Sequence, residues 1–213
     1  MRYLLLGSCL ALSLQNAHAA TTLIDDFTVF QDAYSDTKPS NGPLDISSSG
    51  LTGLSRTLKI TSSDSDDSGE MFSALGTLRI NSDIGTTANA SLVYAFAAID
   101  LASIADALVF DISRIDTGTQ LVIIANQTSE LFWQNISQAG QYVVAFASFS
   151  QPGAFAHLTS LEIKFNNLLN ADFALSRIAA TSTTVPEPSS LALLALGVLA
   201  MRRYQVKAIH SQS

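Results

Sequence analysis

Alternating hydrophobic and polar residues predict β-strands over most of the chain between residues 21 and 184. The segment Leu161–Phe165 alternates strictly, and Leu92, Tyr94 and Phe96 place three large apolar side chains on one face of an extended strand. The same spacing recurs at residues 58 and 60, at 78 and 80, and at 142, 144 and 146. Further strands are predicted at Leu23–Phe30, Leu108–Ile112, Leu121–Ala125, Leu131–Ile136 and Asp172–Ile178.

Turn-forming residues separate these strands, among them Gly118, Gly140, Gly153 and Asn166-Asn167. No part of this region sustains the 3.6-residue period of a long helix, and only a short helical turn is predicted at Leu101–Ala105. About ten strands at this spacing predict an all-β fold, a two-sheet antiparallel β-sandwich over residues 20–184.

Four segments have the pattern expected for strands at the start, middle and end of such a sandwich. They are Ile24–Phe27, Leu108–Ile112, Gly140–Phe146 followed by Phe149, and Ala171–Leu175. With them the region resembles the jelly-roll, galactose-binding-like sandwiches often found in exported bacterial proteins. In those sandwiches the first and last strands lie side by side. The resemblance therefore implies that Asp25 and Asp26 lie near Asp172, where carboxylates can share a structural calcium ion.

The N-terminus has the three parts of a secretory signal peptide. Arg2 supplies a positive charge, Tyr3–Leu14 is almost wholly apolar, and Ala17-His18-Ala19 offers small residues to signal peptidase. We predict cleavage after residue 19. A retained membrane anchor would need about 20 apolar residues, and acylation of Cys9 would need a longer apolar segment before it. Cleavage removes the only cysteine, so the mature chain has no disulfide or thiolate ligand.

The C-terminal segment, residues 185–213, combines an extended motif, an apolar helix and an arginine pair. Pro186-Glu187-Pro188 keeps the chain extended, a shape that a protease-like enzyme can bind. A helix from Ser189 to Tyr204 would be roughly 24 Å long at about 1.5 Å per residue, slightly less than the ~30 Å hydrocarbon core of a membrane. Arg202 and Arg203 keep that end in the cytoplasm by the positive-inside rule, which places the main domain outside.

The order of Pro186-Glu187-Pro188, the apolar Leu191–Met201 and Arg202-Arg203 resembles the PEP-CTERM sorting signal of exported bacterial proteins. In that family an exosortase, a membrane-embedded cysteine transpeptidase, recognises the signal, which implies cleavage near the Pro-Glu-Pro motif. The family occurs in Gram-negative bacteria that make exopolysaccharide. The resemblance implies export across the inner membrane, transient anchoring there, and then a place on the cell surface or in the extracellular matrix. The polar tail Tyr204–Ser213 is longer than usual, and an unprocessed membrane anchor is the alternative.

The region between the two signals is strongly acidic. Residues 21–184 contain 7 basic and 17 acidic residues, a net charge of −10. Phosphate binding depends on clustered lysines and arginines, so this balance argues against nucleic acid or anionic lipid as a partner of the domain.

An acidic cluster at residues 64–70 has part of the pattern of a calcium-binding loop. Asp64, Asp66 and Ser68 occupy alternate positions before Gly69, which permits a sharp turn. The twelfth position of such a loop would be Leu75 instead of a bidentate glutamate. A solvent-exposed acidic loop is therefore the alternative to calcium binding. No other cofactor is expected.

Trp133 is the only tryptophan and the candidate for contact with a sugar. If Phe132 and Ile136 face the core, Leu131 and Trp133 face away from it. An exposed indole ring beside Gln134 would then stack on a sugar ring. Burial of the tryptophan in the core is the alternative.

The sequence lacks the motifs of nucleophilic and nucleotide-dependent enzymes. It has no Gly-x-Ser-x-Gly elbow, Walker motif or dinucleotide fingerprint, and His157 alone cannot form a zinc site. We expect a non-enzymatic surface or matrix protein with affinity for carbohydrate, and exopolysaccharide is its expected partner. The alternative is a secreted polysaccharide hydrolase in which two carboxylates face each other across a groove.

Overall fold

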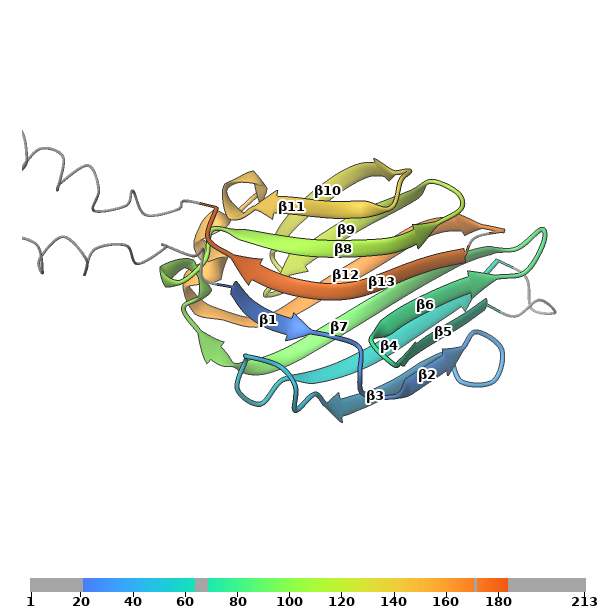
Figure 1. The fold of residues 1–213 in the computed structure, drawn as a ribbon, viewed down its shortest axis with the longest axis horizontal. Coiled ribbons are helices and arrows are strands. Elements are labelled where there is room, and N and C mark those ends of the chain that lie inside the picture. Colours follow the sequence, from blue (N-terminus) through green and yellow to red (C-terminus); the bar gives the residue numbers. More distant parts are fainter. Residues whose placement is uncertain (1–20, 64–68, 171, 184–213) are drawn as a thin grey trace, which may run out of the picture. The chain divides into compact units, whose positions relative to one another are not determined.

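The computed structural model describes residues 21–63, 69–170 and 172–183, which fold as two antiparallel sheets packed face to face (Figure 1). The predicted all-β sandwich is confirmed. Strands in the described part of the chain are β1 (Thr21–Asp25), β2 (Gln31–Tyr34), β3 (Ser40–Asp45), β4 (Ser55–Ser62), β5 (Gly69–Ala74), β6 (Thr77–Ser82), β7 (Thr87–Ile99), β8 (Ala107–Ile115), β9 (Thr119–Ala125), β10 (Ser129–Ile136), β11 (Gly140–Ala145), β12 (Leu158–Leu169) and β13 (Asp172–Thr181).

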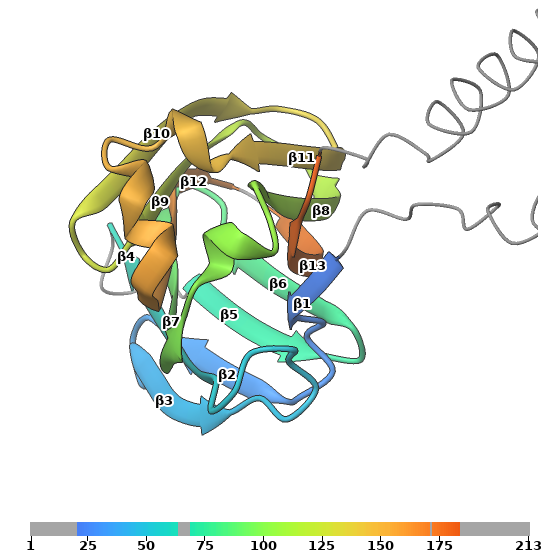
Figure 2. The same cartoon turned by 90° about the vertical axis from the view of Figure 1, so that its left-hand side faces the viewer.

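Short 3-10 helices lie together at one end of the sandwich (Figure 2). They are η1 (Leu101–Ser103), η2 (Phe146–Ser148) and η3 (Pro152–His157). The first of them confirms the helical turn predicted at Leu101–Ala105. At its start the Asp100 carboxylate accepts a hydrogen bond of 3.1 Å from the backbone N–H of Ser103, which satisfies a donor that the helix leaves free.

The two sheets contain seven and six strands. The seven-stranded sheet has the order β11-β8-β13-β6-β5-β2, and β1 also pairs with β13. The six-stranded sheet has the order β10-β9-β12-β7-β4-β3. Strands β1 and β13, far apart in the sequence, lie side by side as expected, with Thr21 opposite Thr181.

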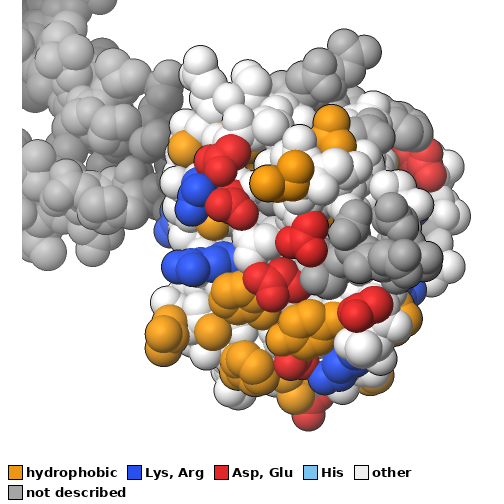
Figure 3. All heavy atoms as spheres, turned by 90° about the vertical axis from the view of Figure 1, so that its right-hand side faces the viewer, with side chains coloured by type: hydrophobic (Ala, Val, Ile, Leu, Met, Phe, Trp, Pro, Cys, Tyr) orange, Lys and Arg blue, Asp and Glu red, His pale blue; other side chains and the backbone are white. Residues whose placement is uncertain are grey.

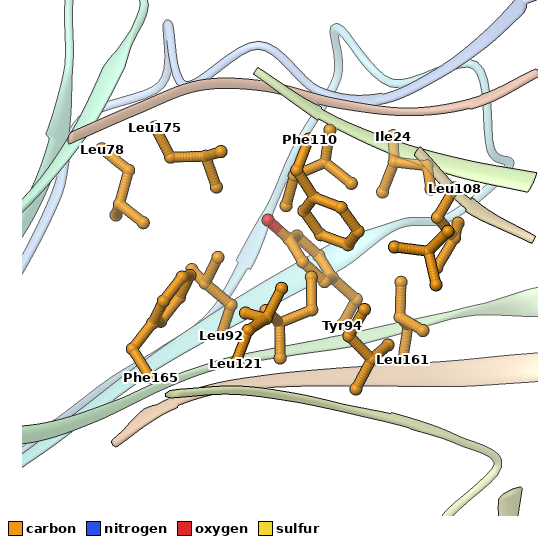
Figure 4. Packing of buried hydrophobic residues seen from close by; sticks show 14 of the residues in the cluster. Ile24, Leu78, Leu92, Tyr94, Leu108, Phe110, Leu121, Leu161, Phe165 and Leu175 are labelled. Atoms are coloured by element: carbon orange, nitrogen blue, oxygen red, sulfur yellow. The ribbon is translucent and has the colours of Figure 1, made fainter. Parts of the chain in front are cut away.

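The core fills the space between the sheets because every second side chain of most strands points inward. In β4 the buried Leu58 and Ile60 alternate with the more exposed Thr57, Lys59 and Thr61. Figure 4 shows core residues of the two sheets facing each other, among them Leu78, Phe110 and Leu175 of one and Leu92 and Phe165 of the other. Full burial of each such side chain contributes about 1.5–3 kcal/mol.

The predicted strand Leu23–Phe30 ends early, at Asp25. The Asp25 carboxylate accepts a hydrogen bond of 2.8 Å from the backbone N–H of Phe27, and Phe27 has a left-handed φ of 56°. This turn interrupts the extended backbone, so β2 begins only at Gln31.

The predicted signal peptide, residues 1–19, and the predicted sorting segment, residues 185–213, lie outside the described residues. The structure therefore does not test either assignment. Within the described part of the chain, no helix has both the length and the apolar character needed to cross a membrane.

Candidate functional site

The outer face of the six-stranded sheet is hollowed over its central strands. The hollow has a volume of about 460 Å³ and involves β4, β7, β9, β10 and β12. Its lining residues are Lys59, Val93, Ile124, Gln127, Glu130, Ser160, Leu161, Glu162 and Lys164. Most of these side chains are polar or charged, and paired strands hold most of them in place.

Strand register aligns the lining residues in rows across the sheet. One row of successive cross-strand partners is Thr57, Val93, Glu162, Ile124 and Glu130. The neighbouring row is Lys59, Ser91, Lys164 and Val122. Cross-strand partners share a face of the sheet, so each row presents its side chains together on the outer side.

Two lysines and two glutamates balance each other in the hollow. Lys164 Nζ lies 3.7 Å from Glu162 Oε2. Glu162 and Glu130 flank Ile124 on its two neighbouring strands, so their Cα atoms lie two strand spacings, or about 9.5 Å, apart. The hollow is neutral as a whole although the domain is acidic. It therefore suits a neutral, hydroxyl-rich ligand better than a polyanion.

One end of the sandwich has a different character, because acidic, basic and apolar side chains lie close together there (Figure 3). The turn between β6 and β7 lies at this end and includes Asp83 and Ile84, the latter 92% exposed. Leu169 at the end of β12 is 47% exposed.

Asp25, a predicted calcium ligand, belongs to a buried polar network between the sheets. Arg56 Nη1 donates to Asp25 Oδ2 at 2.7 Å, and the Tyr94 hydroxyl donates to the same oxygen at 2.9 Å. All three side chains are fully buried. Arg56 also donates to Gln31 Oε1 and to the Val29 carbonyl, each at 2.8 Å. Burial, together with the Asp25 charge, raises the pKa of Tyr94 well above its ordinary value, so its hydroxyl remains a donor.

The structure does not bring Asp25 and Asp172 together. Asp25 pairs in register with Ile178, whereas Asp172 lies six positions earlier in β13, roughly 20 Å away at about 3.3 Å per residue. Asp172 Oδ2 instead lies 2.8 Å from Arg114 Nη2, which is also 3.0 Å from Asp116 Oδ2. Both predicted ligands thus have an arginine as counter-charge. In residues 21–63, 69–170 and 172–183, no group of three metal-ligating side chains is present.

Several predicted site residues lie outside the described part of the chain. They are Asp64, Asp66 and Ser68 of the acidic loop, the motif Pro186-Glu187-Pro188, and Arg202-Arg203. Their roles stay predictions.

Trp133 lies in β10, where the backbone register pairs it with the core residue Leu121. Its side chain is outside the described part. Leu131, two residues earlier, pairs with Ile123 and packs against the core, so its predicted place on the outer face is wrong. Both alternate sets of this strand contain large apolar residues, and the sequence alone does not determine which set points inward. Stacking of Trp133 on a sugar stays a prediction.

Sequence reasoning did not single out the charged residues of the hollow. The strict alternation of Leu161–Phe165 does place Glu162 and Lys164 together on the polar face of a strand. Lys59 of β4 and Glu130 of β10 join them only through sheet pairing, because β7 lies between β4 and β12, and β9 lies between β10 and β12.

Comparison with known proteins confirms the character of the C-terminal segment. Residues 184–203 match the model of the PEP-CTERM protein-sorting motif. The motif indicates an exported protein that is sorted to the cell envelope. No curated protein sequence matches the chain.

Several carbohydrate-binding modules are similar to this chain in structure. A variant of a family 29 module complexed with mannohexaose has 10% sequence identity and a TM-score of 0.42, over 78% of this chain and 93% of its own. The family 11 module of a cellulosomal cellulase of Clostridium thermocellum has 15% identity and a TM-score of 0.41, over 78% and 96%. A family 11 module from the same organism, in complex with a β-1,3-1,4-mixed-linked tetrasaccharide, has 12% identity and a TM-score of 0.39, over 78% and 97%. These similarities concern the fold alone.

Proposed function

We infer that this protein is a non-enzymatic saccharide-binding protein of the cell surface or extracellular matrix, sorted there by an exosortase-type system. The observation that carries the binding function is the neutral, polar hollow on the six-stranded sheet. Hydroxyl-rich ligands need donors and acceptors at fixed positions, and lysine, glutamate, glutamine and serine side chains supply both. Strand pairing fixes the backbone that carries most of these groups, so binding orders side chains and not a loop.

A glycan array probed with the full chain tests the binding function. Lys164→Ala removes one charge from the hollow, and the matched control Arg79→Ala removes an exposed charge from a strand of the seven-stranded sheet. We expect wild type and the control to bind the same neutral oligosaccharides and Lys164→Ala to bind them about tenfold more weakly, which corresponds to about 1.4 kcal/mol. Equal binding by both variants contradicts the proposed site.

The sorting route has its own test. Replacing Pro186-Glu187-Pro188 by alanines leaves Leu191–Met201 and the arginines intact, so membrane insertion should persist while processing stops. Signal peptidase cleavage after Ala19 should be unaffected. Immunoblots of membrane and medium fractions distinguish the forms by size. Equal processing of variant and wild type contradicts the role of an exosortase.

The Glu130 and Glu162 pair favours a second candidate, a secreted polysaccharide hydrolase. Carboxyl groups of inverting glycosidases lie about 6.5–9.5 Å apart, and two strand spacings are compatible with that range. A general acid in such enzymes is usually held in an apolar pocket, however, whereas Glu130 is exposed. The test is whether the full chain releases reducing sugar from a polysaccharide. If it does and Glu162→Gln abolishes the release, the function is hydrolysis and not binding alone.

A further inference from the structure

The turn between β9 and β10 has an unusual backbone at the edge of the hollow. Asn126 and Gln127 have left-handed φ angles of 51° and 61°, and Thr128 N–H donates to the Ala125 carbonyl at 3.1 Å to close the turn. Positive φ at both central residues is typical of a type I′ turn, which favours Asn followed by Gly. Here the second position is glutamine, for which this backbone is strained.

Hydrogen bonds explain why asparagine occupies the first position. Asn126 Nδ2 donates to the carbonyls of His157 at 2.9 Å and Ala154 at 3.2 Å. Its Oδ1 accepts from the backbone N–H groups of Thr159 at 2.8 Å and Ser160 at 3.3 Å. The side chain thus ties the turn to η3 and the start of β12, and it fixes the position of the residue that follows.

No comparable contact explains Gln127. Its side chain is exposed, lines the hollow, and makes no hydrogen bond within the described residues. Glycine at this position would relieve the backbone without loss of any such contact. The chain therefore keeps an unpaired amide, which is both a donor and an acceptor, beside the charged row of Glu130 and Glu162.

We propose that Gln127 is a specificity-determining residue of the hollow, whose amide hydrogen-bonds hydroxyl groups of a bound neutral saccharide. This assignment rests on the proposed binding function. A neutral amide that both donates and accepts matches a sugar hydroxyl, which also does both. Asn126 fixes the backbone of the turn that carries Gln127, so the bond orders one side chain and not a whole loop.

Two variants of the full chain separate the side chain from the backbone. Gln127→Gly removes the amide and relieves the strain, and Gln127→Met removes the amide but keeps the length and the strain. The matched control is Leu75→Gly in the turn between β5 and β6. Leu75 also has a left-handed φ, of 52°, is 97% exposed, and belongs to the other sheet.

The readouts are affinity for the neutral oligosaccharide bound most tightly on the array and the melting temperature. We expect both Gln127 variants to bind about fivefold to tenfold more weakly and Leu75→Gly to bind normally. Gln127→Gly and Leu75→Gly should each melt about 2–4 °C higher, and Gln127→Met should not. Normal binding by both Gln127 variants overturns the assignment and leaves the proposed function intact. Failure of wild type to bind any glycan overturns both.

Discussion

Replacing Asp25 by alanine should destabilise the sandwich strongly, because it leaves the Arg56 guanidinium buried without a counter-charge. The carboxylate accepts hydrogen bonds from Arg56, from the Tyr94 hydroxyl and from the Phe27 backbone N–H, and all three donors lose their acceptor at once. Removal of one partner of a buried ion pair costs about 3–5 kcal/mol. A domain of this size is stable by about 5–15 kcal/mol, so the loss is a large share of the total.

Urea unfolding of the full chain, followed by circular dichroism, measures this loss as a lower midpoint at an unchanged slope. The double variant Asp25→Leu with Arg56→Met is the control, because it removes both charges and leaves none unpaired. We expect the double variant to be less destabilised than Asp25→Ala. A loss below about 1 kcal/mol for Asp25→Ala would refute the argument that the network is desolvated and structurally required.

Three further perturbations have defined outcomes. The hydrogen bond from Lys38 lowers the pKa of Asp32, so this carboxylate stabilises the fold above its unfolded pKa and loses that effect as pH falls through the folded pKa. Asp32→Asn should therefore cost no more than about 1 kcal/mol at pH 7, and its difference in stability from wild type should shrink as the pH is lowered. If the Asp64 and Asp66 loop binds calcium, calcium at 100 times the dissociation constant should raise the free energy of unfolding by about 2.7 kcal/mol. The same melting curve with calcium and with a chelator would instead identify a solvent-exposed acidic loop. If Trp133 stacks on a sugar from the outer face, Trp133→Ala should weaken polysaccharide binding at little cost in stability, whereas a cost of about 3–5 kcal/mol in a urea melt would contradict sugar stacking.

The sequence predicted the fold where alternation was strong and missed it where strands were short or polar. The alternation in Leu161–Phe165 predicts β12, and the apolar residues that alternate around Tyr94 predict β7. Strand β3 (Ser40–Asp45) is polar and interrupted by Gly42-Pro43, and β2 has only four residues. Neither therefore shows the alternation of apolar and polar residues that predicts a strand. Their place at the sheet edges comes from pairing with β4 and β5.

The candidate site depends on pairings that a linear pattern does not contain. Glu130 and Glu162 are far apart in the sequence and share a row only because β9 lies between their strands. Conversely, Asp25 resembles a surface ligand in the sequence because its partner Arg56 is 31 residues away. Residue type alone shows which side chains are polar. The sheet topology determines which of them line the surface hollow and which form the buried network.

Amide chemical-shift mapping by NMR of the full chain, titrated with the neutral oligosaccharide that binds most tightly on the array, tests the central claim most directly. The account predicts that the perturbed amides belong to the row of Val93, Ile124 and Glu162 and to Gln127, on the outer face of the six-stranded sheet. Perturbations confined to the outer face of the seven-stranded sheet, around Ala174, would contradict it.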